Sequence, residues 1–235
     1  LSMETIDNRV RDILRVKFLT GLFDTPYQTD LALADKEVNS EAHQQVALQA
    51  SREGLVLLKN ANNLLPLDKS QIKRIAVCGP NADEASFALT HYGPVAVEVI
   101  TVLEGIKQQV KEGTKVTYTK GCDLVDANWP ESEIISYPLT AEEKTEIQKA
   151  VDNVKESDVA VVVLGGGIRT CGENKSRTSL DLPGHQQQLL EAIVATGKPV
   201  VLVLINGRPL SINWADKFVP AILEAWYPGS QGRTA

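Results

Sequence analysis

The sequence has little of what usually marks a redox, metal or disulfide-bonded protein. Its 235 residues include three cysteines, three histidines and one methionine. Cys78, Cys122 and Cys171 are odd in number and far apart, with no C-x-x-C pair, which argues against a disulfide framework and a cysteine metal cluster. Cys78 lies in an apolar run and is expected to be a small buried hydrophobe. We therefore expect no metal and no cofactor.

Long apolar runs and a positive charge excess are also missing. No stretch of about eighteen apolar residues is present, so we expect no membrane span. The formal net charge of -6 argues against nucleic acid as a partner, because its binders usually carry a basic patch. With 43% hydrophobic residues, the chain can nevertheless bury a sizeable core.

What the sequence does contain is an alternation of apolar strands and amphipathic helices. In residues 140–154, Thr140 and Glu143 have the spacing of a capping box, and an apolar stripe follows. Near-continuous Val/Ile/Leu runs favour strands that are buried on both faces. The expected strands are 54–60, 74–79, 115–121, 158–167, 199–207 and 220–229, and the expected helices are 40–51, 101–110, 140–154 and 185–196.

This order predicts an α/β fold, with an open, doubly wound and mostly parallel sheet between two helical layers. In such sheets, functional sites lie beyond the carboxyl ends of the strands. Residues 1–35 do not fit the alternation: an amphipathic helix with an apolar stripe is followed by a connector. We therefore expect residues 1–35 to be a terminal helix and interdomain linker, residues 36–235 to be the α/β domain, and the chain to be a piece of a longer polypeptide.

The segment "LGGGIRTCGENKSRTSLDLPG", residues 164–184, begins within the predicted strand 158–167, directly after its apolar run "DVAVVV". A dinucleotide cradle is disfavoured, because Thr170 occupies the third glycine position of G-x-G-x-x-G. Cys171 has no evident base beside it, which disfavours a thiol nucleophile. Glu173 could donate a proton to a leaving group, although a glutamate on a surface loop is more often a solvated carboxylate. The residues alone leave this choice open, because a single carboxylate lacks its catalytic partner.

Several stretches in a consistent order resemble glycoside hydrolase family 3. They are "RVRDILRVKFLTGLFDTPY", "ALQASREGLVLLKNANNLLPLD", "IAVCGPNAD", "GENKSRTSLDLPGHQQQLL", "VVLVLINGRPL" and "AWYPGSQGRTA". The resemblance covers nearly the whole chain. It implies the C-terminal α/β sandwich domain of that family, preceded by a helix and linker from a (β/α)8 barrel of the same polypeptide.

The resemblance further implies a retaining exo-β-glycosidase that hydrolyses terminal β-glucosides or β-xylosides, with an oligosaccharide or aryl β-glycoside as substrate. Glu173 matches the family's general acid/base, whereas the nucleophilic Asp lies on the barrel, before Leu1. Such chemistry needs two carboxyl groups about 5–5.5 Å apart. This chain alone is therefore expected to be inactive. Family members are mostly periplasmic or extracellular, which sets the expected location.

Other residues receive structural or cleft roles. We expect Arg177 and Asp181 to order the loop. Arg177 could pair with the carboxylate of Glu173 or Asp181, because the guanidinium fork suits carboxylates. Trp226 and Tyr227 end a strand and are expected to pack in the core. The candidates for the substrate cleft are Asn174, Lys175, His91 and Tyr92.

Two other functions remain open at this point. The chain could be a non-catalytic carbohydrate-binding or interdomain packing module, which an ordered loop with Glu173 buried away from the strand ends would favour. It could also be a flavodoxin-like nucleotide or receiver module, although the glycine spacing argues against this.

Overall fold

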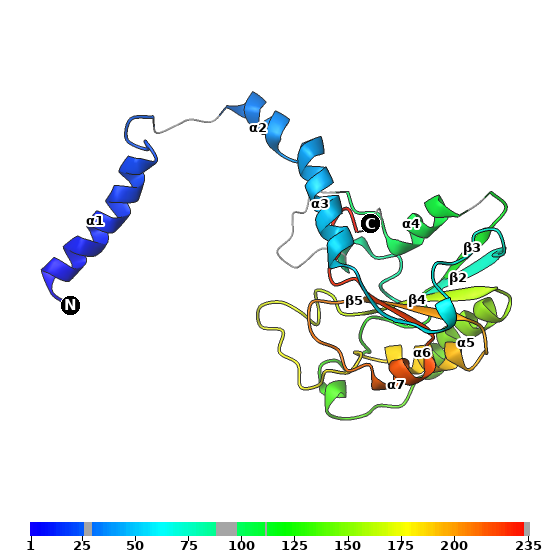
Figure 1. Cartoon of the computed structure of the whole chain (residues 1–235). Coiled ribbons are helices and arrows are strands. Elements are labelled where there is room, and N and C mark those ends of the chain that lie inside the picture. The colour runs from blue at the N-terminus through cyan, green and yellow to red at the C-terminus, as the bar shows by residue number, and fades with distance from the viewer. Residues whose placement is uncertain (26–29, 88–97, 111, 233–235) are drawn as a thin grey trace. The chain divides into compact units, whose positions relative to one another are not determined.

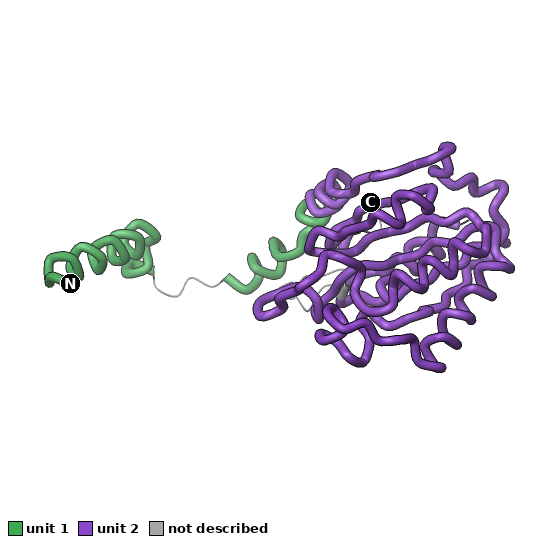
Figure 2. Tube along the Cα trace, turned by 90° about the horizontal axis from the view of Figure 1, so that it is seen from below, with its two compact units in different colours: residues 1–44 green, residues 45–235 purple. Residues whose placement is uncertain are grey.

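The computed structural model describes residues 1–25, 30–87, 98–110 and 112–232 of the chain. These residues divide into two compact units, residues 1–44 and residues 45–235, which Figure 2 colours separately. The boundary expected near residue 35 stays a prediction.

The first unit contains helices α1 (Met3–Leu19) and α2 (Leu31–Glu37). The side chain of Ser2 caps α1 by accepting a hydrogen bond from the Thr5 N–H at 3.2 Å. The predicted apolar stripe of α1 is exposed, with Phe18 65% accessible. Helix α2 corrects the expectation of a plain connector: Asp30 caps it by accepting from the Leu33 N–H at 3.1 Å.

The second unit is built on one sheet, in which the described residues form six strands in the order β1-β6-β5-β4-β2-β3. Five strands are parallel, and β1 pairs antiparallel with β6 at one edge. This arrangement confirms the predicted mostly parallel, doubly wound sheet (Figure 1). The strands are β1 (Val56–Asn60), β2 (Arg74–Cys78), β3 (Lys115–Thr119), β4 (Val159–Gly165), β5 (Val200–Ile205) and β6 (Ala221–Glu224).

Helices cover both faces of the sheet (Figure 1). On one face, α5 (Ala141–Lys155), α6 (Gln186–Val194) and α7 (Asn213–Phe218) supply the larger apolar cluster. On the other face lies α4 (Val102–Gln109), while α3 (Glu41–Gly54) leads into β1. The predicted capping box of α5 is present, and its buried side chains are the predicted Ile147, Ala150, Val151 and Val154.

Cysteines follow the burial that their surroundings predict. Cys78 ends β2 with none of its surface exposed, and burial raises the pKa of its thiol to about 12. Burial likewise raises the pKa of Cys122 to about 12. Both thiols therefore act as small apolar side chains of the core. In the described part of the chain, no helix has the length and apolarity needed to cross a membrane.

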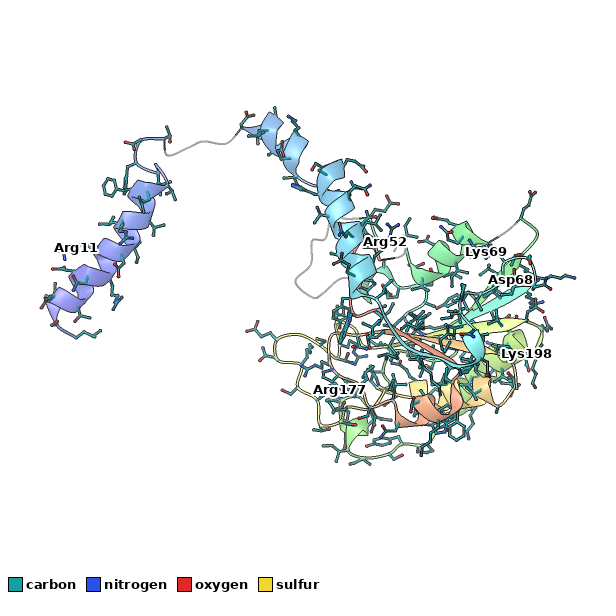
Figure 3. The ribbon with its side chains drawn as sticks, viewed as in Figure 1. Arg11, Arg52, Asp68, Lys69, Arg177 and Lys198 are labelled. Carbon is teal, nitrogen blue, oxygen red and sulfur yellow. The ribbon has the colours of Figure 1, made fainter. Side chains whose placement is uncertain are left out.

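The strand order decides where a site can form. The chain passes from β2 to β3 on one side and then to β4 on the other side of β2, so the direction of winding reverses between β2 and β4. Ligand sites of open α/β sheets lie at this reversal, beyond the carboxyl ends of the strands. In Figure 3, Arg177 lies at that end of the domain, opposite Lys198 and Asp68, which precede β5 and β2.

Candidate functional site

The β4–α6 loop, residues 166–185, leaves the central strand at the reversal point. Its first turn needs glycine at Gly165, where φ is +137° and a Cβ would lie 2.1 Å from the carbonyl oxygen of Ile205. The loop therefore departs close against β5. On its other side, Asn81 after β2 donates from Nδ2 to the Gly166 carbonyl oxygen at 2.8 Å.

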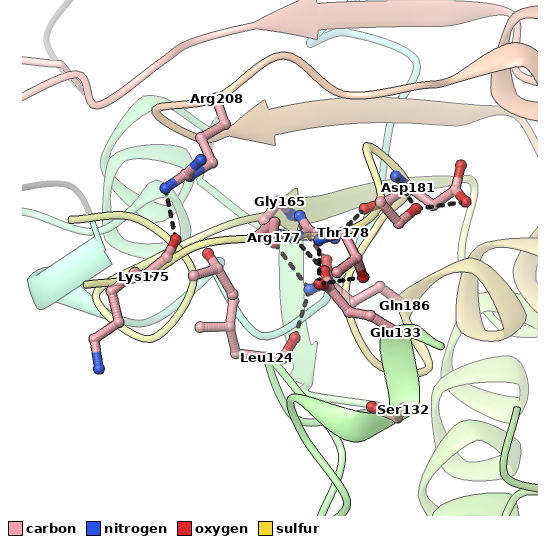
Figure 4. Close-up of polar contacts among 12 residues, drawn as sticks. Leu124, Ser132, Glu133, Gly165, Lys175, Arg177, Thr178, Asp181, Gln186 and Arg208 are labelled. Carbon is pink, nitrogen blue, oxygen red and sulfur yellow. Dashed lines mark hydrogen bonds and ion pairs between the residues drawn. The ribbon is translucent and has the colours of Figure 1, made fainter. Parts of the chain in front are cut away.

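Gln186 closes the base of this loop from the start of α6. Its Oε1 accepts from the Gly165 N–H at 2.8 Å, and its Nε2 donates to the carbonyl oxygens of Gly165 at 2.9 Å and Leu124 at 2.8 Å (Figure 4). The side chain is fully buried. Sequence reasoning missed Gln186, although a signal existed: it occupies an inward position of the α6 stripe that otherwise holds Leu189, Leu190 and Ile193.

Glu173 lies exposed in the turn of the loop. Gly172 before it and Asn174 after it both have positive φ, +135° and +59°. The turn is closed by the Lys175 N–H, which donates to the Gly172 carbonyl oxygen at 3.2 Å. Arg208, after β5, donates from Nη2 to the Lys175 carbonyl oxygen at 2.6 Å (Figure 4). The backbone on the carboxyl side of Glu173 is thus tied to the neighbouring strand end.

The loop has a second anchor at Arg177, on the side facing the β3–α5 connection. Arg177 pairs with the carboxylate of Glu133, and its Nη2 donates to the Asp181 carbonyl oxygen at 2.8 Å. Thr178 adds its backbone N–H and its hydroxyl to Glu133 Oε2, at 2.8 and 3.1 Å (Figure 4). The carboxylate that Arg177 contacts is therefore Glu133, a residue that sequence reasoning did not single out, and not Asp181.

Asp181 has a more local role. Its carboxylate accepts from the Ser179 hydroxyl at 2.8 Å, and its N–H donates back to Ser179 Oγ at 3.0 Å. The next residues, Leu182 and Pro183, are buried, so the loop enters the core there before α6 begins. The side chain of Asp181 thus fixes the local turn with Ser179 where the loop leads back to α6, and its carbonyl oxygen accepts from Arg177.

The two aromatic residues after β6 differ from the expectation of core packing. Trp226 is 47% exposed and has a positive φ of +54°, so that prediction is wrong for Trp226. Tyr227 is half-buried, and a Cβ on Gly207 would lie 2.3 Å from its ring. Burial, reinforced by the Cys171 thiol, raises the pKa of Tyr227 above its usual range. His91 and Tyr92 lie outside the described residues.

A buried carboxylate lies at the end of β6. Glu224 Oε1 accepts from the Trp226 N–H at 2.9 Å, and Asn206 donates from Nδ2 to Oε2 at 3.1 Å. Burial raises the pKa of Glu224, against the opposing effect of these hydrogen bonds. This carboxylate holds the ends of β5 and β6 together.

An open groove of about 440 Å³ lies beside the start of the β4–α6 loop. Ile168 and Arg169 of the loop form one wall, and Lys120 and Asp123 after β3 form another. No group of three or more His, Cys, Asp or Glu side chains is arranged to hold a metal ion in the described ranges. The described residues thus place an exposed carboxylate, Glu173, on an anchored loop whose first residues also line this groove.

Comparison with known proteins gives a consistent result. Residues 55–235 match the model of the glycosyl hydrolase family 3 C-terminal domain. A beta-xylosidase of Formosa agariphila is 40% identical over 99% of this chain and 31% of its own length. A periplasmic beta-glucosidase of Salmonella typhimurium is 36% identical over 100% of this chain and 32% of its own. The chain thus spans about a third of the length of these relatives.

Solved structures agree with the sequence relatives. The beta-glucosidase of Listeria innocua in complex with glucose aligns with a TM-score of 0.81 and 30% identity. The alignment covers 100% of this chain and 30% of that protein. The family model, the sequence relatives and the solved structure thus indicate the same family.

Proposed function

The chain belongs to glycosyl hydrolase family 3, in which it matches the C-terminal domain, and from this premise we propose that it is the α/β domain of a retaining exo-β-glycosidase. The substrates we propose are oligosaccharides or aryl glycosides that end in a β-glucosyl or β-xylosyl unit. Two relatives support this range, since one is a beta-xylosidase and the other a periplasmic beta-glucosidase.

In this proposal Glu173 is the general acid/base. As the acid, it protonates the glycosidic oxygen while a nucleophilic Asp on a (β/α)8 barrel of the same polypeptide attacks the anomeric carbon. As the base, it then takes a proton from the water that releases the sugar from the covalent intermediate. This division of roles needs the two carboxyl groups about 5–5.5 Å apart, which a carboxylate on a projecting loop can reach from a second domain.

The observation that carries the proposal is the position of Glu173. It is exposed in a loop that leaves the reversal point of the sheet, where open α/β folds place their ligand sites. Burial of Glu173 away from the strand ends would have favoured a non-catalytic packing module, whereas Glu173 is exposed.

The remaining parts of the proposal follow the same division. Asn174 and Lys175, next to Glu173, are proposed to line the substrate cleft. His91 and Tyr92 are further candidates on sequence grounds alone. Arg177 and Asp181 are proposed to order the loop. Residues 1–35 are proposed to lead from the barrel into the α/β domain, and the periplasmic relative supports a periplasmic or extracellular location.

The test is Glu173→Gln in the full-length enzyme, assayed for kcat/KM. We expect glycosides with poor alkyl leaving groups to slow by about 100-fold or more, because their oxygen needs a proton. The hydrolysis of a dinitrophenyl glycoside should slow far less, because dinitrophenolate can leave without being protonated. The control is Glu146→Gln, which removes an exposed partner of Lys149 on α5. Equal losses on both substrates would remove Glu173 from the acid role.

Two further outcomes decide between the candidate functions. If Glu173→Gln changes kcat/KM for neither substrate, the result favours a non-catalytic carbohydrate-binding or interdomain module. The 235-residue chain alone should not hydrolyse an aryl β-glucoside, because the nucleophile is proposed to lie elsewhere. Turnover by this chain at ordinary rates would contradict the two-domain mechanism.

A further inference from the structure

We propose that Glu133 is a positioning residue for Glu173: its buried ion pair with Arg177 sets where the β4–α6 loop places the acid/base. This inference rests on the proposed function. It adds a residue from a different connection, the segment between β3 and α5, to the machinery of the acid step.

The ion pair is buried and fully engaged. The side chain of Glu133 is 5% exposed and that of Arg177 is 6% exposed. One carboxylate oxygen of Glu133 contacts Arg177, and the other accepts two hydrogen bonds from Thr178. Burial alone would raise the pKa of Glu133, but the Thr178 N–H and the Arg177 guanidinium outweigh it and lower that pKa. The carboxylate is therefore ionised at neutral pH, as the pair requires.

The guanidinium of Arg177 is held from more than one side. Besides Glu133, it donates to the Asp181 carbonyl oxygen and lies 5.4 Å from the centre of the Trp129 ring. A planar fork can serve a carboxylate, a carbonyl oxygen and an aromatic face together, which a lysine ammonium cannot do with the same geometry. Arg177 thus joins two parts of the loop to the β3–α5 connection.

The connection that carries Glu133 is itself well fixed. Glu133 ends a short 3-10 turn, Glu131–Glu133. Asp126, 6% exposed, accepts from the Asn128 N–H at 2.8 Å and from the Ser132 hydroxyl at 2.6 Å. The turn is therefore a firm support, and the loop, whose tip is exposed, is the part that would move if the pair were lost.

The position of the pair explains why its loss should reach Glu173. Arg177 follows Glu173 by four residues. The Arg208 contact to the Lys175 carbonyl oxygen holds the turn that carries Glu173, and Arg177 holds the chain directly after this turn. Without Glu133, Arg177 would be a buried cation without its carboxylate partner. The guanidinium would then move toward solvent, and the loop would move with it. A displacement of about 1 Å at a reacting group can cost up to about 100-fold in rate.

The experiment is Glu133→Gln in the full-length enzyme, with kcat/KM measured for a series of glycosides well below the unfolding temperature. We expect about a tenfold or larger loss for an alkyl glycoside, and a loss below about threefold for the dinitrophenyl glycoside. If Glu133 affected stability alone, kcat/KM would fall equally for all substrates, because only the folded fraction would change. Glu146→Gln, which breaks an exposed pair, serves as the matched control and should change neither value.

A second variant keeps the test decisive if Glu133→Gln folds poorly. Arg177→Lys keeps a cation opposite Glu133 but gives up the fork, so it should show the same selective loss to a smaller degree. Equal losses on both glycosides in these variants, or no loss in either, would overturn the inference. If Glu173→Gln is selective and Glu133→Gln is not, only the positioning role fails. If Glu173→Gln is not selective, the acid role fails, and the positioning role with it.

Discussion

Gln186 and Gly165 lie 21 residues apart and bond to each other in both directions: the Gly165 N–H donates to Gln186 Oε1, and Gln186 Nε2 donates to the Gly165 carbonyl oxygen. The same Nε2 reaches the Leu124 carbonyl oxygen. One buried amide therefore satisfies backbone groups at the end of β4 and in the β3–α5 connection. The strand that leads to Glu173 and the segment that carries Glu133 are joined at this point.

Gln186→Glu should destabilise the protein by about 2–3 kcal/mol at pH 7, because a buried carboxylate would face two carbonyl oxygens in place of an N–H donor. Below the pKa of the new carboxyl group the loss should shrink, since its O–H can donate again. Urea unfolding at several pH values measures this difference. Gln188→Glu, exposed on the same helix, is the control and should change stability little. A pH-independent loss would contradict the assigned contacts.

Glu133→Gln should lower the stability of the protein most at neutral pH. The pKa of Glu133 is lowered from 4.5, so its ionised form contributes stability above that value, and this contribution is lost as the pH falls through the lowered pKa. The gap in the urea midpoint between the wild type and the variant should therefore narrow in acid. Glu146→Gln should show little gap at any pH, because exposed pairs contribute little. A gap that widened in acid would be inconsistent with this ion pair.

Glu224→Gln should have the opposite effect and raise the urea midpoint at neutral pH. Burial raises the pKa of Glu224, so its ionised form costs stability above that pKa. A glutamine oxygen can still accept from the Trp226 N–H and from Asn206 Nδ2. The gain should vanish as the pH falls and the wild-type carboxyl becomes protonated. Glu191→Gln, at an exposed position of α6, is the control. A loss of stability in Glu224→Gln at pH 7 would show that the charge at Glu224 is needed.

Asn174 has a φ of +59°, a region in which glycine is free and alanine is strained. Asn174→Gly should therefore be more stable than Asn174→Ala, by about 1 kcal/mol. Ser176 is an exposed residue of the same loop without a positive φ, so Ser176→Gly should not be more stable than Ser176→Ala. Thermal unfolding of the four variants checks this, and an alanine variant as stable as the glycine variant at position 174 would contradict the left-handed turn.

Much of the fold follows from local sequence patterns. The apolar runs predicted the buried strands, and the Thr140–Glu143 spacing predicted the start of α5 and its inward face. The alternation of these elements then predicted a mostly parallel sheet, because such strands need helices on both faces. The position of Glu173 beyond β4 followed from that arrangement.

The contacts that hold the loop did not follow from the sequence. The sequence suggested that Arg177 could pair with the carboxylate of Glu173 or Asp181, whereas the carboxylate that it contacts belongs to Glu133, 44 residues earlier in the chain. Trp226 was expected in the core, yet it is 47% exposed and has a positive φ two residues after β6. Neither outcome has a local pattern behind it.

The sequence by itself determined the strands, the helices other than α2 and α7, and the strand end from which the candidate acid/base projects, because periodicity and capping act over a few neighbouring residues. Only the tertiary structure decided which side chains fix that loop. Gln186 at the start of α6, Glu133 in the β3–α5 connection and Arg208 after β5 contact the loop or its base. They come together only because the sheet brings the ends of β3, β4 and β5 to one edge.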